Sequence, residues 1–306
     1  MKALHKYYPY RWLAARIHKY IVWLNPKNEM RRTYYKVYHR FPDLDNPQNL
    51  IEKIFWMQLH TDTSMWTRCA DKYAMREYVK ECGFEDYLPK NYGKWENVED
   101  IDFSLLPNEF VLKTNNGCGT VLIVRDKGSI NKKATMKKLQ QWLNVPFGWA
   151  GAELHYTRIK PCIIAEELLH QDSEDGKVTS RSLTDYKIWC FSGKPECILV
   201  VHDRSERVNY TLDMYNTLWE RIPNSLKLNK HHAEYDEILP KPRCLNQMME
   251  MAAKLSTPFA EVRVDFYVIK GRPYVGELTF TSGYGNYTDS FYEYLGSKVQ
   301  LPQKTK

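Results

Sequence analysis

The strongest constraint on the fold is a hairpin near the carboxyl-terminal end of the chain. Residues 262–280 alternate apolar and polar side chains on either side of Lys270-Gly271-Arg272, which has the composition of a turn. We expect a three-residue loop with its glycine in the left-handed conformation, which pairs Ile269 with Pro273. Successive side chains of a strand point to opposite faces, so this register decides which side chains meet across the hairpin.

One face of the predicted hairpin gathers four polar side chains. The register sets Asp265 opposite Glu277 and places Arg263 opposite Thr279, with opposed Cβ atoms about 5 Å apart. Two carboxylates at that separation repel unless a cation lies between them. Mg²⁺ prefers one or two carboxylates together with substrate phosphates, so the pair predicts a magnesium site. The alternative is a surface hairpin whose acids are neutralised by Arg263.

Length and cysteine content exclude several classes of protein. A chain of 306 residues corresponds to about two domains, and no stretch approaches the roughly 18 consecutive apolar residues of a membrane span. The seven cysteines are scattered, with no CxxC pair, and no HExxH motif is present, which disfavours a zinc hydrolase. Reduced thiols are the simplest interpretation, so we expect a cytoplasmic protein.

Positive charge is concentrated at the amino-terminal end. Residues 1–40 contain ten Lys and Arg and one acid, whereas the remaining 266 residues contain 34 basic and 36 acidic side chains. A general nucleic-acid-binding fold is therefore disfavoured. Apolar side chains from Leu13 to Leu24 recur at helical spacing, which predicts a basic amphipathic helix ending near Asn25-Pro26. Either this helix packs on the body with its bases solvated, or it docks to membrane headgroups or an acidic polymer.

A glycine-containing loop joins two predicted strands in the first half of the chain. Lys113 ends the first strand, and Thr120 begins the second. Gly117 and Gly119 free the backbone between them to approach a ligand, so that N–H groups can point at phosphate oxygens. No Gly-Lys-Ser/Thr opens a helix, so this is not a Walker A loop. An ordinary hairpin turn is the alternative.

Further charged side chains lie at the ends of predicted elements. These are Lys72, Glu166, Glu167, Asp185, Lys187 and Arg204. The two glutamates end a short buried strand, where backbone groups could hold a purine ring, and Lys72 follows Asp71 in the first turn of a helix. Taken singly, each has an ordinary interpretation as a solvated or ion-paired side chain.

The order of these pieces resembles the ATP-grasp superfamily. More closely, it resembles the TupA-like ATP-grasp family, which is named for teichuronopeptide biosynthesis and recurs in bacterial loci for capsular and cell-surface polysaccharides. The resemblance runs from about residue 42 to 295. The matching pieces are 71–73 with Arg76, 110–113 with Gly117 and Gly119, 164–167, 185–187 with Gly193, 203–204, 262–267 and 276–280. No single piece is specific, but their shared order is.

The resemblance implies an α+β fold in which two lobes grip ATP, and the interleaving of predicted strands and helices favours the same class. We expect a basic helical extension over residues 1–60 and a first lobe with a glycine-rich phosphate flap over 61–160. The second lobe, over 161–306, would carry an adenine hinge and the Mg²⁺-binding hairpin.

The resemblance also implies roles for individual residues. ATP contacts are expected from Lys72, Lys113, Gly117, Gly119, Thr120, Glu166, Glu167, Leu168, Leu169, Asp185 and Lys187. Catalytic roles are expected for Lys187, Arg204 and Arg263. Metal ligands are expected at Asp265, Glu277 and Thr279, although the superfamily usually has Asn where Thr279 stands.

These roles imply an ADP-forming carboxylate–amine ligase that uses ATP and Mg²⁺ and acts through an acyl phosphate. The family context implies a uronic acid of a bacterial surface polysaccharide, or its precursor, and an amino acid or small amine as substrates. A sugar kinase, a glycosyltransferase of the same pathway and a non-catalytic nucleotide-binding protein are the alternatives. No nucleic-acid partner is expected, and the basic segment raises the hypothesis of peripheral contact with the inner face of the membrane.

Overall fold

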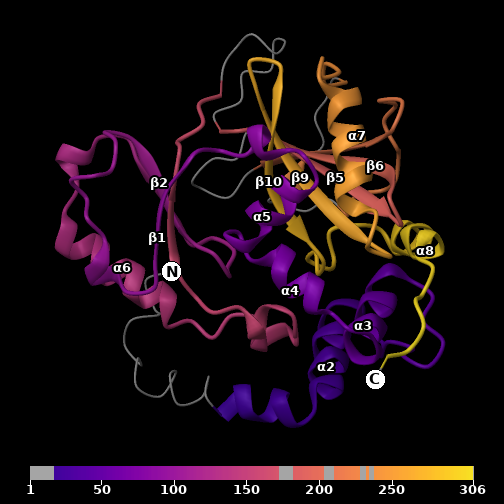
Figure 1. The fold of residues 1–306 in the computed structure, drawn as a ribbon. Helices are drawn as coiled ribbons and strands as arrows, with labels where there is room; N and C mark the ends of the chain where they lie inside the picture. The colour runs from indigo at the N-terminus through magenta and orange to yellow at the C-terminus, as the bar shows by residue number, and fades with distance from the viewer. Residues whose placement is uncertain (1–16, 172–181, 203–209, 228–231, 234–237, 306) are drawn as a thin grey trace.

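The computed structural model describes residues 17–171, 182–202, 210–227, 232–233 and 238–305. Within these residues the chain forms a four-stranded and a six-stranded sheet with helices packed around them (Figure 1), which confirms the expected α+β fold. In these parts of the chain, every helix is too short or too polar to cross a bilayer.

Ten strands make up the two sheets. They are β1 (Asn91–Trp95), β2 (Phe110–Thr114), β3 (Val121–Val124), β4 (Ile163–Glu166), β5 (Asp185–Phe191), β6 (Lys194–His202), β7 (Tyr210–Asn216), β8 (His232–Ala233), β9 (Val262–Ile269) and β10 (Arg272–Thr279). The labelled α-helices are α2 (Pro26–Tyr38), α3 (Leu50–His60), α4 (Ser64–Ala70), α5 (Ala74–Glu81), α6 (Lys132–Leu143), α7 (Leu245–Ser256) and α8 (Asp289–Lys298). Residues 17–24 form a further helix before α2.

The smaller sheet has the order β1-β4-β2-β3, with each neighbouring pair antiparallel. Its apolar side chains form a small core with α6 that includes Phe110, Leu139 and Ile163. Although β4 comes after α6 in the sequence, it lies between β1 and β2 in the sheet. The boundary expected between residues 160 and 161 therefore differs from the topology, because β4 shares a sheet with the strands that flank the glycine loop.

The larger sheet has the order β10-β9-β5-β6-β7-β8 and lies at the centre of the main core. Helix α7 contributes Met248 and Leu255 to this core. The core also contains Tyr34 of α2, Phe55 of α3 and Val79 of α5. Apolar side chains from the expected 1–60 segment and from the start of the expected first lobe thus belong to the same core as the larger sheet.

The β9–β10 hairpin reaches the predicted pairing by a different route. The turn has two residues, Lys270 and Gly271, both with positive φ, and it pairs Ile269 with Arg272, so the expected three-residue loop is wrong. A bulge at Gly276 takes up one residue and restores the register. Asp265 is therefore opposite Glu277, as predicted, because the bulge offsets the shorter turn.

The helix over 17–24 ends before Asn25, as predicted, but α2 starts directly after it. Asn25 caps α2 by accepting a hydrogen bond from the N–H of Asn28 at 3.1 Å. The apolar line that includes Ile17 and Leu24 faces solvent, whereas Val22 is fully buried. Packing on the body through that apolar line, one of the two interpretations of this helix, is therefore wrong.

Candidate functional site

Lys72 connects the two sheets. It lies in the turn between α4 and α5, where Asp71 accepts a hydrogen bond from the N–H of Tyr73 at 2.8 Å. The amino group of Lys72 donates to the carbonyl oxygen of Gly117 at 2.6 Å and lies 3.7 Å from Oε2 of Glu277. One cation therefore joins the glycine loop of the smaller sheet to the hairpin of the larger sheet.

The polar face of the hairpin carries the four side chains that the register predicts. Arg263 donates from Nε and Nη2 to the two oxygens of Asp265, each at 2.7 Å. Arg263 Nη2 also donates to Oγ1 of Thr279 at 3.3 Å and lies 3.6 Å from Oε1 of Glu277. Lys187, directly opposite Asp265 on β5, places its Nζ 2.5 Å from Oδ2 of that carboxylate. Five side chains from β5, β9 and β10 thus form one connected cluster.

Asp185 extends this cluster along β5. Its Oδ2 atom lies 3.5 Å from Nζ of Lys187, and its side chain is buried. The cluster then contains three cations (Lys72, Lys187 and Arg263) and three carboxylates (Asp185, Asp265 and Glu277), whose formal charges cancel. A divalent cation added to it would leave an excess of positive charge, which suits a polyphosphate ligand.

Electrostatic effects within the cluster differ from residue to residue. Burial alone raises the pKa of Glu277, but the charges of Lys72, Lys187 and Arg263 outweigh it and hold the pKa well below its ordinary value. Burial also raises the pKa of Asp265, and there Arg263 and Lys187 only oppose the effect. For Arg263, burial lowers the pKa, yet Asp265 and Glu277 outweigh burial and raise it. Glu277 is therefore the carboxylate held most firmly in its charged form.

The glycine loop between β2 and β3 is closed by two threonines. The hydroxyl oxygens of Thr114 and Thr120 lie 2.6 Å apart, and the N–H of Thr114 donates to the carbonyl oxygen of Thr120 at 3.3 Å. A Cβ on Gly117 would come within 3.0 Å of Oγ1 of Thr120. Gly119 has a φ of +70°, a conformation that side chains disfavour. A side chain at Gly117 would crowd the Thr120 hydroxyl, and a side chain at Gly119 would strain the backbone.

A second ion-pair cluster lies at the end of β4. Glu166 has its Oε2 atom 2.5 Å from Nζ of Lys113, and its Oε1 atom accepts a hydrogen bond from Arg76 at 3.1 Å. The N–H of Glu167 donates to the carbonyl oxygen of Lys90 at 2.8 Å. The Glu166 carboxylate thus orients two cations, and a hinge for adenine here would depend on the backbone of residues 168–169.

The segment between α6 and β4 brings further side chains to the site. Glu153 accepts a hydrogen bond from Oγ1 of Thr281 at 2.6 Å, and burial raises its pKa. Burial also raises the pKa of Tyr156, and the charges of Glu277 and Glu153 add to that effect. His155 is fully buried, which lowers its pKa to about 3. No motif surrounds these residues, so they could not be predicted from the sequence.

Two other sequence expectations have different outcomes. Arg204 lies outside the described residues. Arg76, which was part of a matching motif but was not expected in the site, contacts Glu166. No local signal could have identified it, because its partner Glu166 lies 90 positions away in the sequence.

The residues of the hairpin fit a bound Mg²⁺. Glu277 is about one third exposed (34%), and both of its ion-pair distances exceed hydrogen-bond range, so its oxygens can accept a cation. Asp265 is nearly buried and already held by Arg263 and Lys187. In the described parts of the chain, no three His, Cys, Asp or Glu side chains gather as a metal site. A cation would therefore also need oxygens from Thr279, from phosphates or from water.

The structure therefore has a glycine loop on one antiparallel sheet that is linked through Lys72 to a charged hairpin on a second sheet, which agrees with the ATP-grasp class that the sequence resembles. The family model of TupA-like ATP-grasp proteins matches residues 52–300. The chain belongs to the TupA-like ATP-grasp family.

Solved structures show more distant similarity. The D-alanine–D-alanine ligase from Bacillus anthracis complexed with ATP has a TM-score of 0.48 and 17% identity, with 78% of this chain and 67% of that chain covered. The ATP-grasp ligase PsnB complexed with a minimal precursor has a TM-score of 0.42 and 9% identity over 78% of this chain and 61% of that one. The ADP complex of N5-carboxyaminoimidazole ribonucleotide synthetase has a TM-score of 0.42 and 14% identity, covering 76% and 51%. No curated protein matches the chain.

Proposed function

We propose that this protein is an ADP-forming carboxylate–amine ligase that uses ATP and Mg²⁺. A substrate carboxylate attacks the γ-phosphorus of ATP and displaces ADP, which forms an acyl phosphate. An amine then attacks the acyl carbon, and phosphate leaves as the amide bond forms. The reaction needs no covalent enzyme nucleophile, because positioning and electrostatic stabilisation of the phosphoryl oxygens lower the barrier.

The position of Lys72 is the observation that carries this proposal. Its ammonium lies between the Gly117 carbonyl and the Glu277 carboxylate, at 2.6 and 3.7 Å. In this position the Lys72 ammonium can neutralise a polyphosphate that binds beneath the glycine loop. The carboxylates of the hairpin can bind a metal ion beside the same phosphates. The family match over residues 52–300 supports the same function.

In this proposal, different residues of the chain bind the phosphates and the metal. Lys72 and Lys187 neutralise charge on the phosphates, and the backbone of the Gly117–Thr120 loop covers them. Asp265, Glu277 and Thr279 are the residues that would hold Mg²⁺, which would supply further neutralisation of phosphoryl charge when bound. Arg263 orients Asp265 through two hydrogen bonds.

The adenosine end of the nucleotide would be held by residues around β4 and by Asp185 of the cluster. We assign Lys113 to the phosphates on the side of adenine, Asp185 to the ribose, and the backbone of residues 168–169 to the base, because the N–H of Glu167 already donates to Lys90. Glu166 would act by orienting Lys113, which it contacts at 2.5 Å. Arg204 is assigned to the acyl phosphate from the family resemblance alone.

We further propose that the carboxylate belongs to a uronic acid of a bacterial capsular or cell-surface polysaccharide, or to its precursor, and that the amine is an amino acid or a small amine. Family context supports this choice, since the family is named for teichuronopeptide biosynthesis. The ten bases among residues 1–40 also suit an acidic substrate or surface.

ADP release measured against a matrix of uronic acids and amines, with and without Mg²⁺, tests the proposal. We expect release only when Mg²⁺, a carboxylate and an amine are present together. Release that needs a sugar but no amine would indicate phosphoryl transfer to a hydroxyl. Thermal stabilisation by a nucleotide sugar and none by ATP would indicate a glycosyltransferase instead.

Glu277→Gln separates catalysis from mere nucleotide binding. Loss of one metal-binding carboxylate is expected to lower ADP release by about 10²–10³-fold. Glu99→Gln is the matched control, because Glu99 is exposed beside the smaller sheet and its replacement should leave turnover unchanged. Equal turnover in wild type and the Glu277 variant would contradict the assignment of this face as the site of chemistry.

A further inference from the structure

The helix over residues 17–24 turns large apolar side chains toward solvent. Those that are more than half exposed are Ile17 (53%), Tyr20 (59%), Ile21 (55%), Trp23 (63%) and Leu24 (61%). On the other side of the helix, Val22 is fully buried and His18 lies 3.3 Å from Glu29. At about 100° per residue, the five exposed side chains occupy one continuous arc and the two inward side chains the opposite arc. The usual arrangement of an amphipathic helix on a protein body is therefore reversed.

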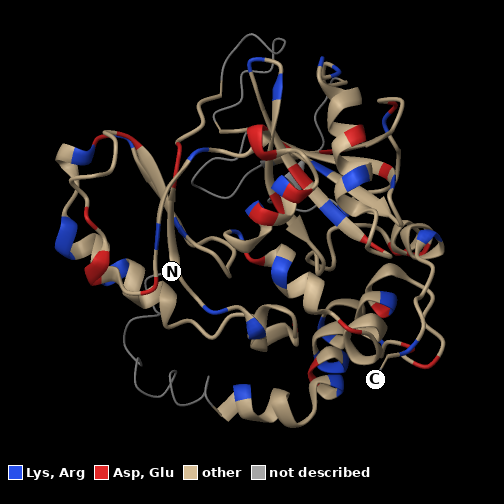
Figure 2. Cartoon of the chain, in the orientation of Figure 1, with Lys and Arg blue, Asp and Glu red and all other residues tan. Residues whose placement is uncertain are grey.

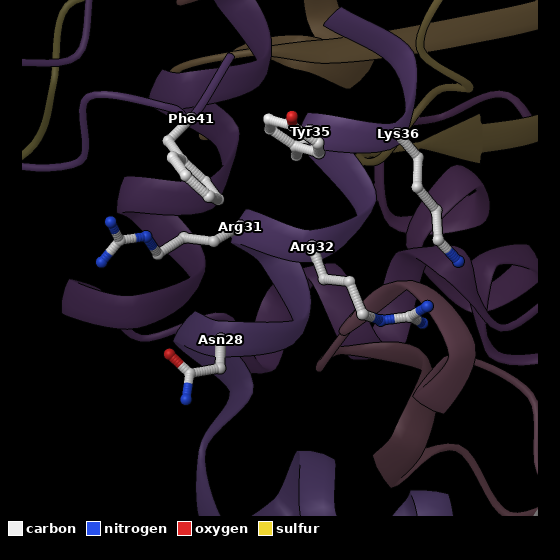
Figure 3. A pocket seen from close by; sticks show the side chains of 6 residues that line it. All are labelled: Asn28, Arg31, Arg32, Tyr35, Lys36 and Phe41. Carbon is white, nitrogen blue, oxygen red and sulfur yellow. The ribbon is translucent and has the colours of Figure 1, made fainter. Parts of the chain in front are cut away.

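The outward face of α2, the next helix, is cationic. An open hollow of about 530 Å³ is lined by Asn28, Arg31, Arg32, Tyr35, Lys36 and Phe41 (Figure 3). The Arg31 guanidinium lies 5.1 Å from the Phe41 ring centroid, and Tyr35 stacks on the same ring at 5.0 Å. Arg32 is engaged by Glu29. Within the described ranges, no carboxylate lies within 4 Å of the charged ends of Arg31 or Lys36, so these two cations can meet an external anion.

Net charge reinforces this pattern. Residues 17–41 contain six bases (Lys19, Lys27, Arg31, Arg32, Lys36 and Arg40) and a single acid, Glu29. Figure 2 shows several of these bases along α2 at the lower edge of the molecule. Trp and Tyr side chains favour the headgroup level of a bilayer, and Lys and Arg are attracted to anionic lipids. A soluble polyanion would gain little from five exposed apolar side chains, so the combination favours a membrane over an acidic glycan.

We propose that residues 17–41 form a docking surface for a membrane with anionic headgroups. The apolar arc of helix 17–24 enters the boundary between headgroups and acyl chains, and Arg31 and Lys36 contact lipid phosphates. Lys19 lies 5.2 Å from the Trp149 ring, in the segment that leads to Glu153 and Tyr156, so the surface is joined to the part of the chain beside the site. The inference does not depend on the proposed ligase reaction.

Flotation of the full chain with vesicles tests the proposal. Vesicles of two parts phosphatidylcholine to one part phosphatidylglycerol should bind the protein, whereas phosphatidylcholine alone should bind it much more weakly. Trp23→Ser should lower binding at least about tenfold, because it removes the largest apolar contact. Arg31→Gln with Lys36→Gln should lower it about 25-fold, since each cation near an anionic surface contributes about fivefold.

Matched control positions lie around the smaller sheet. Leu105→Ser replaces an apolar side chain that is 83% exposed, and Lys133→Gln with Lys137→Gln removes two exposed cations from α6. These variants should bind vesicles like wild type, and the docking variants should retain ADP release with soluble substrates.

Three results would overturn the proposal. The first is no difference in binding between the two kinds of vesicle. The second is binding to a soluble polyuronate that Arg31→Gln with Lys36→Gln abolishes, without vesicle binding, which would identify an acidic glycan as the partner. The third is a dimer in light scattering that Trp23→Ser separates, without vesicle binding, which would identify a second copy as the partner.

Discussion

Replacing Lys72 by Met removes the cation between the two sheets and keeps most of the side chain's volume. The ion pair with Glu277 spans 3.7 Å. Two unit charges near that separation attract by about 1 kcal/mol in water and about 4 kcal/mol at an effective dielectric of 20. Because Glu277 is one third exposed, we expect a coupling free energy between the two residues of about 1–2 kcal/mol.

Lys72→Met also removes the hydrogen bond to the Gly117 carbonyl, and a hydrogen bond to a charged group contributes about 1.5–3 kcal/mol. The effect on turnover should be larger than the effect on folding. A preorganised group that stabilises charge in the transition state contributes about 10²–10³-fold, so kcat/KM for ATP should fall by that factor.

The assay is a double-mutant cycle. Urea unfolding of wild type, Lys72→Met, Glu277→Gln and the double variant gives the coupling free energy. ADP release gives kcat/KM for wild type and Lys72→Met, with Lys133→Met, on the exposed face of α6, as control. A coupling below about 0.3 kcal/mol, together with kcat/KM unchanged in Lys72→Met, would refute the role of Lys72 as the link between loop and hairpin.

Three further predictions concern the loop, pH and the metal. Gly119→Ala places a side chain at a φ of +70°, so urea unfolding should show a loss of about 1 kcal/mol; an unchanged midpoint would contradict the strain. Burial lowers the pKa of His155 to about 3 in the folded protein, whereas the same side chain in the unfolded chain has a pKa of about 6.5. The free energy of unfolding should therefore fall as the pH drops below about 6.5, by about 2 kcal/mol at pH 5. His155→Leu should remove the part of this pH dependence that comes from His155. If the variant and the wild type lost the same free energy of unfolding between neutral and acid pH, the prediction would be contradicted. Thr279→Asn supplies a stronger neutral ligand and should lower the Mg²⁺ concentration for half-maximal ADP release; an unchanged titration would show that residue 279 does not contact the metal.

Side-chain alternation predicted that Asp265 and Glu277 belong to the polar sides of their strands, but it did not fix their pairing. The predicted pairing is correct because the bulge at Gly276 offsets a turn that is one residue shorter than expected. One extra residue in the second strand can be accommodated either by a three-residue turn or by a two-residue turn followed by a bulge. The sequence Lys270-Gly271-Arg272 is compatible with both. The structure uses a two-residue turn and a bulge at Gly276. The periodicity of the sequence therefore predicts which side chains share a face of the hairpin, but it does not predict the turn length or the bulge.

Contacts between distant segments were the hardest to predict. The pairing of Arg76 with Glu166 joins residues 90 positions apart, and nothing local to either residue specifies it. Strand β1 was missed because a bulge between Asn91 and Gly93 interrupts alternation. The orientation of helix 17–24 could not be decided from the sequence, because an apolar line can face a core or an external surface. The exposure of Ile17 and Leu24 and the burial of Val22 settle it.

The central place of β4 in the smaller sheet has a consequence for biosynthesis. When synthesis has reached Arg158, strands β1, β2 and β3 have been made. Strand β4, which lies between β1 and β2 in the sheet, is still missing. Until Ile163–Glu166 emerges, the inner side of β2 stays open as a template for intermolecular pairing. Nascent chains stalled in this interval should therefore be those most dependent on chaperones, even though the flap itself has already been translated.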